Sequence, residues 1–159
     1  MTTEKPRTAQ VHLTWAGEHR FDSGRPGGPT MRIDASGQTA QSPVDTLVSA
    51  LAACTAVDVV DILAKRRSPL ASLSIDAVAT RREEIPRRIV AAELTYHLAG
   101  EGVERAHAER AIELAISKYC SVRESLDANI PVHYRAVVNG ELGELRLAGT
   151  APDAAGSPV

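Results

Sequence analysis

The stretch between residues 44 and 64 is the longest apolar run in the chain, and it approaches the length of a membrane span. It nevertheless carries three aspartates, at positions 45, 58 and 61, and each of them would be costly inside a bilayer. Just before the run, Ser42 stands at an N-cap, Pro43 at the first helical position and Asp45 at the third, so Ser42 and Asp45 can form a capping box. We therefore predict a buried helix from Ser42 to about Arg67.

Segments with the two-residue alternation of β-strands lie on both sides of this helix. A second amphipathic helix is indicated by apolar residues at helical spacing between positions 104 and 119. We expect three short strands at 10–16, 18–22 and 30–34 that form an antiparallel meander, and further strands at 72–83, 87–98 and 131–139. Long antiparallel strands separated from two helices indicate an α+β fold rather than a doubly wound parallel sheet. Two largely apolar helices need cover on more than one face, which an intertwined homodimer would supply.

The length of 159 residues and the 43% hydrophobic content fit one domain over residues 1–147, followed by a flexible tail at 148–159. A formal net charge of −2 gives no overall attraction to nucleic acid or to an anionic membrane. The opening MTTEKPRTAQ lacks the apolar core of a secretory signal, so we expect a cytoplasmic protein. The expected partner is a small molecule or another protein.

The chain has two cysteines, Cys54 within the apolar helix and Cys120 at the end of the second helix. In a reducing compartment, a disulfide between them would be transient and catalytic rather than structural. Two inert core thiols are the alternative, because unpaired cysteine is often buried. A metal site is disfavoured, since neither a C-x-x-C motif nor a histidine at ligand spacing accompanies either thiol. A Cys-His dyad stays open.

Cys54 lies about ten residues into its helix, where the helix dipole no longer favours a thiolate. On a regular helix it shares a face with Asp58 and Asp61, and two carboxylates beside a thiolate would oppose it. We therefore expect an arginine from elsewhere, which Asp58 either orients or leaves alone as a solvent-facing residue. The candidates are Arg20, Arg25, Arg32, Arg81 and Arg82.

Three segments resemble a known family. SPVDTLVSALAACTAVDVVDIL, the run TRREEIPRR and AIELAISKYCSV, in this order, are similar to the OsmC/Ohr family of thiol-dependent peroxide-detoxifying proteins. The resemblance extends over about residues 15–138. It is closest to the OsmC-like branch with KYCSV around the second cysteine, rather than to the best-studied hydroperoxide reductases.

The resemblance implies a homodimer with active sites at the subunit interface and a role in oxidative stress defence. Cys54 matches the peroxide-attacking cysteine of the family, and Cys120 matches the resolving one. The Cys54 thiolate would reduce an organic hydroperoxide to its alcohol and become a sulfenic acid, which Cys120 would convert to a disulfide. An external dithiol, such as a lipoyl-type one, would reduce that disulfide. The resemblance implies no cofactor and no metal.

Two family positions differ from the expected pattern. Active members hold the thiolate with an arginine from the early strands, which Arg20 matches roughly, and with a glutamate near the start of the cysteine helix. Val44 stands at the glutamate position. The alternative function is therefore a non-catalytic OsmC-like protein that binds a small ligand or senses oxidants. The few aromatic residues favour a site lined by aliphatic side chains and suited to alkyl groups.

Overall fold

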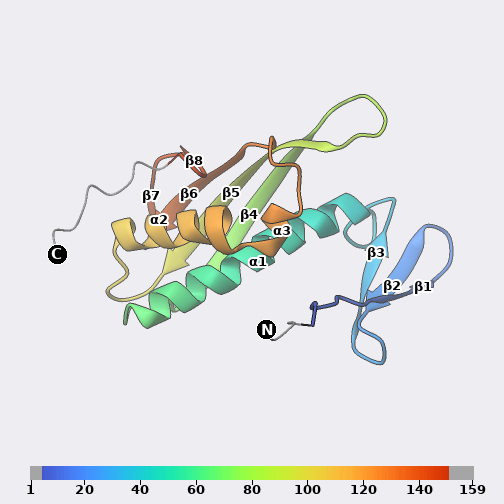
Figure 1. The fold of residues 1–159 in the computed structure, drawn as a ribbon, viewed down its shortest axis with the longest axis horizontal. Helices are drawn as coiled ribbons and strands as arrows, with labels where there is room; N and C mark the ends of the chain where they lie inside the picture. The colour runs from blue at the N-terminus through green and yellow to red at the C-terminus, as the bar shows by residue number, and fades with distance from the viewer. Residues whose placement is uncertain (1–4, 151–159) are drawn as a thin grey trace. The chain divides into compact units, whose positions relative to one another are not determined.

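The computed structural model describes residues 5–150, which fall into two compact units, Met1–Leu47 and Val48–Val159. Figure 1 shows the mixed architecture, with a small sheet in the first unit and a larger sheet covered by helices in the second. The last nine residues of the expected tail lie outside the described residues. The preceding three are described: the Ala148 amide donates to the Val132 carbonyl, and the Gly149 amide to the Glu113 carboxylate.

The first unit is built on three short antiparallel strands, β1 (His12–Trp15), β2 (Arg20–Gly24) and β3 (Thr30–Asp34). Trp15 pairs with Phe21, and Phe21 pairs with Ile33, so these side chains share one face of the sheet. After β3, the buried carboxylate of Asp34 accepts hydrogen bonds from Ser36 and Thr39, and these bonds lower the pKa of Asp34 well below its usual range. The three-stranded meander expected from the sequence is confirmed.

Helix α1 (Pro43–Lys65) follows with the predicted capping box. The Ser42 amide donates to Asp45 at 3.0 Å, and the Asp45 amide donates to the Ser42 hydroxyl at 3.2 Å. The buried residues of the helix recur every fourth position, as Leu51, Thr55, Val59 and Leu63. The opposite side is exposed, so the prediction of a buried helix holds for one stripe only.

Helix α1 is also the one helix among the described residues that is long and apolar enough to cross a membrane. Length and composition are weak evidence for such a span, because the core helix of a soluble protein meets the same criteria. Here the helix contacts protein along its buried stripe: the Thr55 hydroxyl bonds with Tyr96 of the sheet.

The second unit contains a sheet in which β4 (Ser72–Arg81) and β5 (Ile89–Ala99) form a long antiparallel pair. Strand β6 (Val132–Val138) lies on the other side of β5 and runs parallel to it. The two-residue strands β7 (Glu141–Leu142) and β8 (Arg146–Leu147) both pair with β6. The parallel pair was not expected; it is possible because a long crossover, residues 100–131, connects β5 to β6.

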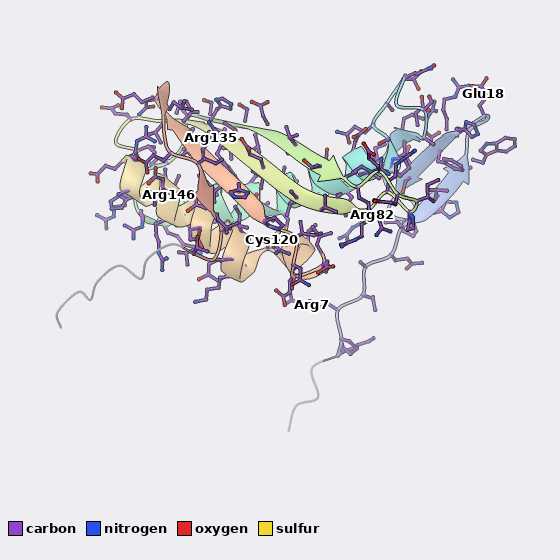
Figure 2. All side chains as sticks on the ribbon, turned by 90° about the horizontal axis from the view of Figure 1, so that it is seen from above. Arg7, Glu18, Arg82, Cys120, Arg135 and Arg146 are labelled. Carbon is purple, nitrogen blue, oxygen red and sulfur yellow. The ribbon has the colours of Figure 1, made fainter. Side chains whose placement is uncertain are left out.

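The crossover carries helix α2 (Arg105–Leu114), a π-helical turn η1 (Ala115–Tyr119) and a short helix α3 (Ser121–Glu124). Both α1 and α2 cover the same face of the sheet (Figures 1 and 2). On that face the alternate residues of β5 and β6 are buried and join one core with the apolar stripes of the two helices. The α+β class and the order of the main elements are therefore confirmed, whereas the π-helical turn was not predicted.

Candidate functional site

Cys54 lies beside the buried stripe of α1, one residue before Thr55. Its side chain is half-buried, as expected for a position at the edge of the stripe. Both cysteines are free thiols, and their side chains lie close enough together for Cys54 to raise the pKa of the Cys120 thiol. The structure thus brings together two residues that the sequence placed on different helices.

Cys120 is located where the helical crossover is interrupted. Its backbone is extended between η1 and α3, it is only 3% exposed, and it caps α3 because its sulfur accepts the Arg123 amide at 3.2 Å. Figure 2 shows it on the helix-covered side of the sheet. Because one thiol is half-exposed and the other is buried, a reagent from solvent reaches Cys54 more easily.

The electrostatics of Cys120 follow from this position. Burial raises the pKa of the Cys120 thiol to about 11, the Arg123 amide lowers it, and the neighbouring Cys54 thiol raises it further. Cys120 is therefore a neutral thiol at physiological pH. A buried neutral thiol is suited to second place in a reaction in which Cys54 acts first.

A hydrogen bond between α1 and the sheet lies next to the thiols. The Thr55 hydroxyl donates to the Ala52 carbonyl at 2.9 Å, so its oxygen accepts the proton of the Tyr96 hydroxyl at 2.7 Å. Burial raises the pKa of Tyr96 above its usual range, and Cys120 lies close enough to add to the rise. Because Thr55 follows Cys54 directly in α1, this bond to β5 holds the part of the helix that carries Cys54 against the sheet.

The side chain of Arg123 stabilises the loop that follows Cys120 and α3 through hydrogen bonds. Its guanidinium donates to the carbonyls of Asp127, Ala128 and Ile130, while Arg88 forms an ion pair with Asp127 at 3.2 Å. Sequence reasoning missed Arg123 because the group that contacts the thiol is its backbone amide, which carries no sequence signal.

Asp58 lies one turn after Cys54 and lines a surface pocket of about 530 Å³ with Asp61, Ile62, Lys65, Arg66 and Tyr119. Within residues 48–150, Asp58 makes no ion pair, and its role toward an arginine stays a prediction. Charged side chains predominate in this pocket, and Cys54 is not among its lining residues, so the aliphatic lining expected for the site stays a prediction.

Four of the five candidate arginines have other partners. Arg20, in β2, forms an ion pair with Glu18 at 2.8 Å, and Arg32 pairs with Asp22. Arg81 and Arg82 donate to backbone carbonyls of their own hairpin loop. Arg20 belongs to the first unit, so its role toward Cys54 stays a prediction. Among the described residues, no group of three or more His, Cys, Asp or Glu side chains could hold a metal ion.

Comparisons with known proteins agree with the fold. A model of the family described as OsmC-like protein matches residues 35–135. Protein YhfA of Escherichia coli (strain K12) is 32% identical over 131 residues, covering 80% of this chain and 98% of YhfA.

Solved structures extend the comparison. A protein from Aquifex aeolicus VF5 has a TM-score of 0.72 and 26% identity, covering 84% of this chain and 98% of its own. The organic hydroperoxide resistance protein OhrB of Bacillus subtilis has a TM-score of 0.56 and 16% identity over 82% of this chain and 98% of its own, a likeness of fold alone. Because the family model matches well over half of the sequence and YhfA is covered almost completely, this chain belongs to the OsmC-like protein family.

Proposed function

We propose that the protein is a thiol-dependent peroxidase that reduces organic hydroperoxides, with Cys54 as the nucleophile and Cys120 as the resolving residue. Membership of the OsmC-like family indicates a redox or peroxide-related function. The observation that carries the finer proposal is the proximity of a half-buried thiol, Cys54, to a buried one, Cys120. That pairing gives a first thiol which a peroxide can reach and a second thiol in contact with it.

The proposed reaction has three steps. The Cys54 thiolate attacks the distal oxygen of ROOH, the O–O bond breaks, and the alkoxide takes a proton to leave as ROH. The Cys120 thiol then attacks the sulfur of the Cys54 sulfenic acid, forming the disulfide and releasing water. An external dithiol exchanges with this disulfide, becomes oxidised itself and restores both thiols.

Arg20 and Asp58 enter this proposal in supporting roles. Because Cys54 lies too far along its helix for the helix dipole to favour a thiolate, that thiolate needs a cation, and Arg20 is on the strand expected to provide it. Val44 stands where active family members have a glutamate that helps to hold the thiolate. Asp58 would orient that guanidinium from its position one turn after Cys54. Removal of either charge should slow the first step and leave the second unchanged.

We also propose that two copies of the chain form the functional unit. Trp15 in the first sheet is 67% exposed, and Val57 on the free side of α1 is 61% exposed. Leu13, Met31 and Val60 are exposed as well. Large apolar side chains gathered on a sheet face and on a helix stripe are typical of surfaces that a partner covers, and a second copy of the chain is the partner that we propose.

Turnover of cumene hydroperoxide with a dithiol tests the proposal. Cys54→Ser should abolish turnover, because the attacking sulfur is gone. Cys120→Ser should consume one equivalent of peroxide and leave a sulfenic acid that dimedone traps on Cys54, as peptide mass spectrometry can show. Undiminished turnover in Cys54→Ser would disprove the mechanism, and undiminished multiple turnover in Cys120→Ser would remove its assigned role.

The same experiment separates the alternative function. A binding or sensing protein with the same thiols would oxidise at most once per chain, and added dithiol would not restart peroxide consumption. Inert thiols would react slowly with any thiol reagent in the folded protein.

A further inference from the structure

The turn before Cys120 departs from α-helical geometry. The Cys120 amide donates to the Ala115 carbonyl, five residues earlier, at 2.9 Å. Such π-helical turns are rare and occur mostly as single turns, often at functional sites. Here the wide turn comes directly before the buried thiol, at the point where the crossover approaches α1.

The wide turn decides which side chain is buried next to α1. On a regular α-helix, the residue that continues the row of Ala111 and Ala115 is Tyr119. Ala111 and Ala115 are fully buried, but Tyr119 is 49% exposed, whereas Cys120 is 3% exposed and contacts Cys54. If the turn relaxed to an α-helix, Tyr119 would return to the row and the Cys120 thiol would move away from Cys54.

Ser117 lies in the middle of this turn. Its hydroxyl donates to the Glu113 carbonyl at 2.6 Å, although its surroundings are open to solvent. A serine hydroxyl bonded to the carbonyl four residues back competes with the regular backbone ladder and bends a helix. The bond therefore stabilises the irregular turn at the position where the register widens.

We propose that Ser117 is a positioning residue: by holding the π-helical turn, it keeps the Cys120 thiol against Cys54. The inference rests on the pairing of the two thiols in the proposed function, but not on the peroxide being the oxidant. Because Ser117 is exposed, replacing it removes the hydroxyl without opening a cavity in the core.

The test compares three variants in disulfide formation driven by diamide, which oxidises two thiols to a disulfide and is itself reduced to the hydrazine. Ser117→Ala should slow formation of the Cys54–Cys120 disulfide about three- to tenfold, the effect expected from loss of one hydrogen bond. Ser117→Thr keeps the hydroxyl and should restore the parent rate. Ser125→Ala is the matched control, because Ser125 makes the same bond to the Ser121 carbonyl at 2.8 Å at the end of the regular helix α3.

A second readout separates positioning from general stability. In a Cys120→Ser background, only the first reaction of Cys54 with diamide can be measured. Its rate should be the same with and without the additional change Ser117→Ala, since Ser117 affects only the second step, in which Cys120 reacts. Equal disulfide rates in Ser117→Ala and the parent, or an equal loss in Ser125→Ala, would overturn the inference. A parent that forms the disulfide with diamide but does not turn over peroxide would disprove the proposed peroxidase and leave the inference intact.

Discussion

The two cysteines differ in how far solvent can reach them. Cys54 is half-buried on α1, while Cys120 is buried next to it. Burial raises the pKa of Cys120 to about 11, so its thiolate is scarce below pH 9. This difference supports the proposed order, in which Cys54 reacts with the oxidant and Cys120 then reacts with the oxidised sulfur of Cys54.

Alkylation of the reduced protein checks this order. At pH 8, iodoacetamide should modify Cys54 much faster than Cys120, because the reagent needs an accessible thiolate. From pH 8 to pH 11 the rate of modification of Cys120 should keep rising, since its raised pKa delays deprotonation, whereas that of an ordinary cysteine levels off above about pH 9.5. Peptide mass spectrometry measures both sites; a plateau for Cys120 near pH 9.5, or modification of Cys120 before Cys54, would contradict the assignment.

At the scale of elements, α1 is tied to β5 by the bond from Tyr96 to Thr55. The two hydroxyl groups depend on this bond to different degrees. The Thr55 hydroxyl donates its proton to the Ala52 carbonyl, so it keeps a hydrogen bond if the Tyr96 hydroxyl is removed. The buried Tyr96 hydroxyl has no described acceptor other than Thr55. The helix that carries Cys54 therefore depends on the threonine more than on the tyrosine hydroxyl.

Urea unfolding of two single variants tests this asymmetry. Thr55→Val should lower the free energy of unfolding by about 1–3 kcal/mol, because a buried hydroxyl loses its acceptor. Tyr96→Phe should lower it by only about 0.5–1.5 kcal/mol, the net value of one hydrogen bond. The double variant should be no less stable than Thr55→Val, since it buries no unsatisfied donor. A larger loss in Tyr96→Phe would show that the tyrosine has another essential partner.

Patterned segments and local capping were predictable, whereas geometry that depends on distant contacts was not. The capping box at Ser42 and Asp45 is local, so it was predicted correctly. The direction of β6 depends on how the crossover closes, and strands of two residues carry no periodic signal. In the site, the resemblance identified both cysteines, but the π-helical turn and the Arg123 amide are backbone features that side-chain patterns do not record.

For the whole molecule, the exposed apolar surface is the property that a single copy leaves unexplained. Val57 and Val60 lie on the free stripe of α1, three residues apart and therefore on neighbouring positions of one face. If two copies pack against each other on this stripe, both valines become buried. A carboxylate introduced at either position would then lose its contact with water, which is unfavourable.

Mass measurement in solution tests this association. The parent should have the mass of two chains by light scattering, and Val57→Asp should raise the dissociation constant by about two orders of magnitude or more, because a carboxylate would be buried without a partner. Ala106→Asp, on the exposed side of α2, is the control and should keep the parent mass. A monomeric parent, or an unchanged mass in Val57→Asp, would exclude this stripe as the interface.

The parallel arrangement of β5 and β6 has a consequence for the order of events during synthesis. Cys120 lies in the crossover between these strands, and the crossover is fixed only when β6 pairs with β5. Contacts between segments distant in sequence form late, because their loop must close first. Cys54 thus leaves the ribosome long before its partner, and the two sulfurs meet only after the strand that completes the sheet has been made.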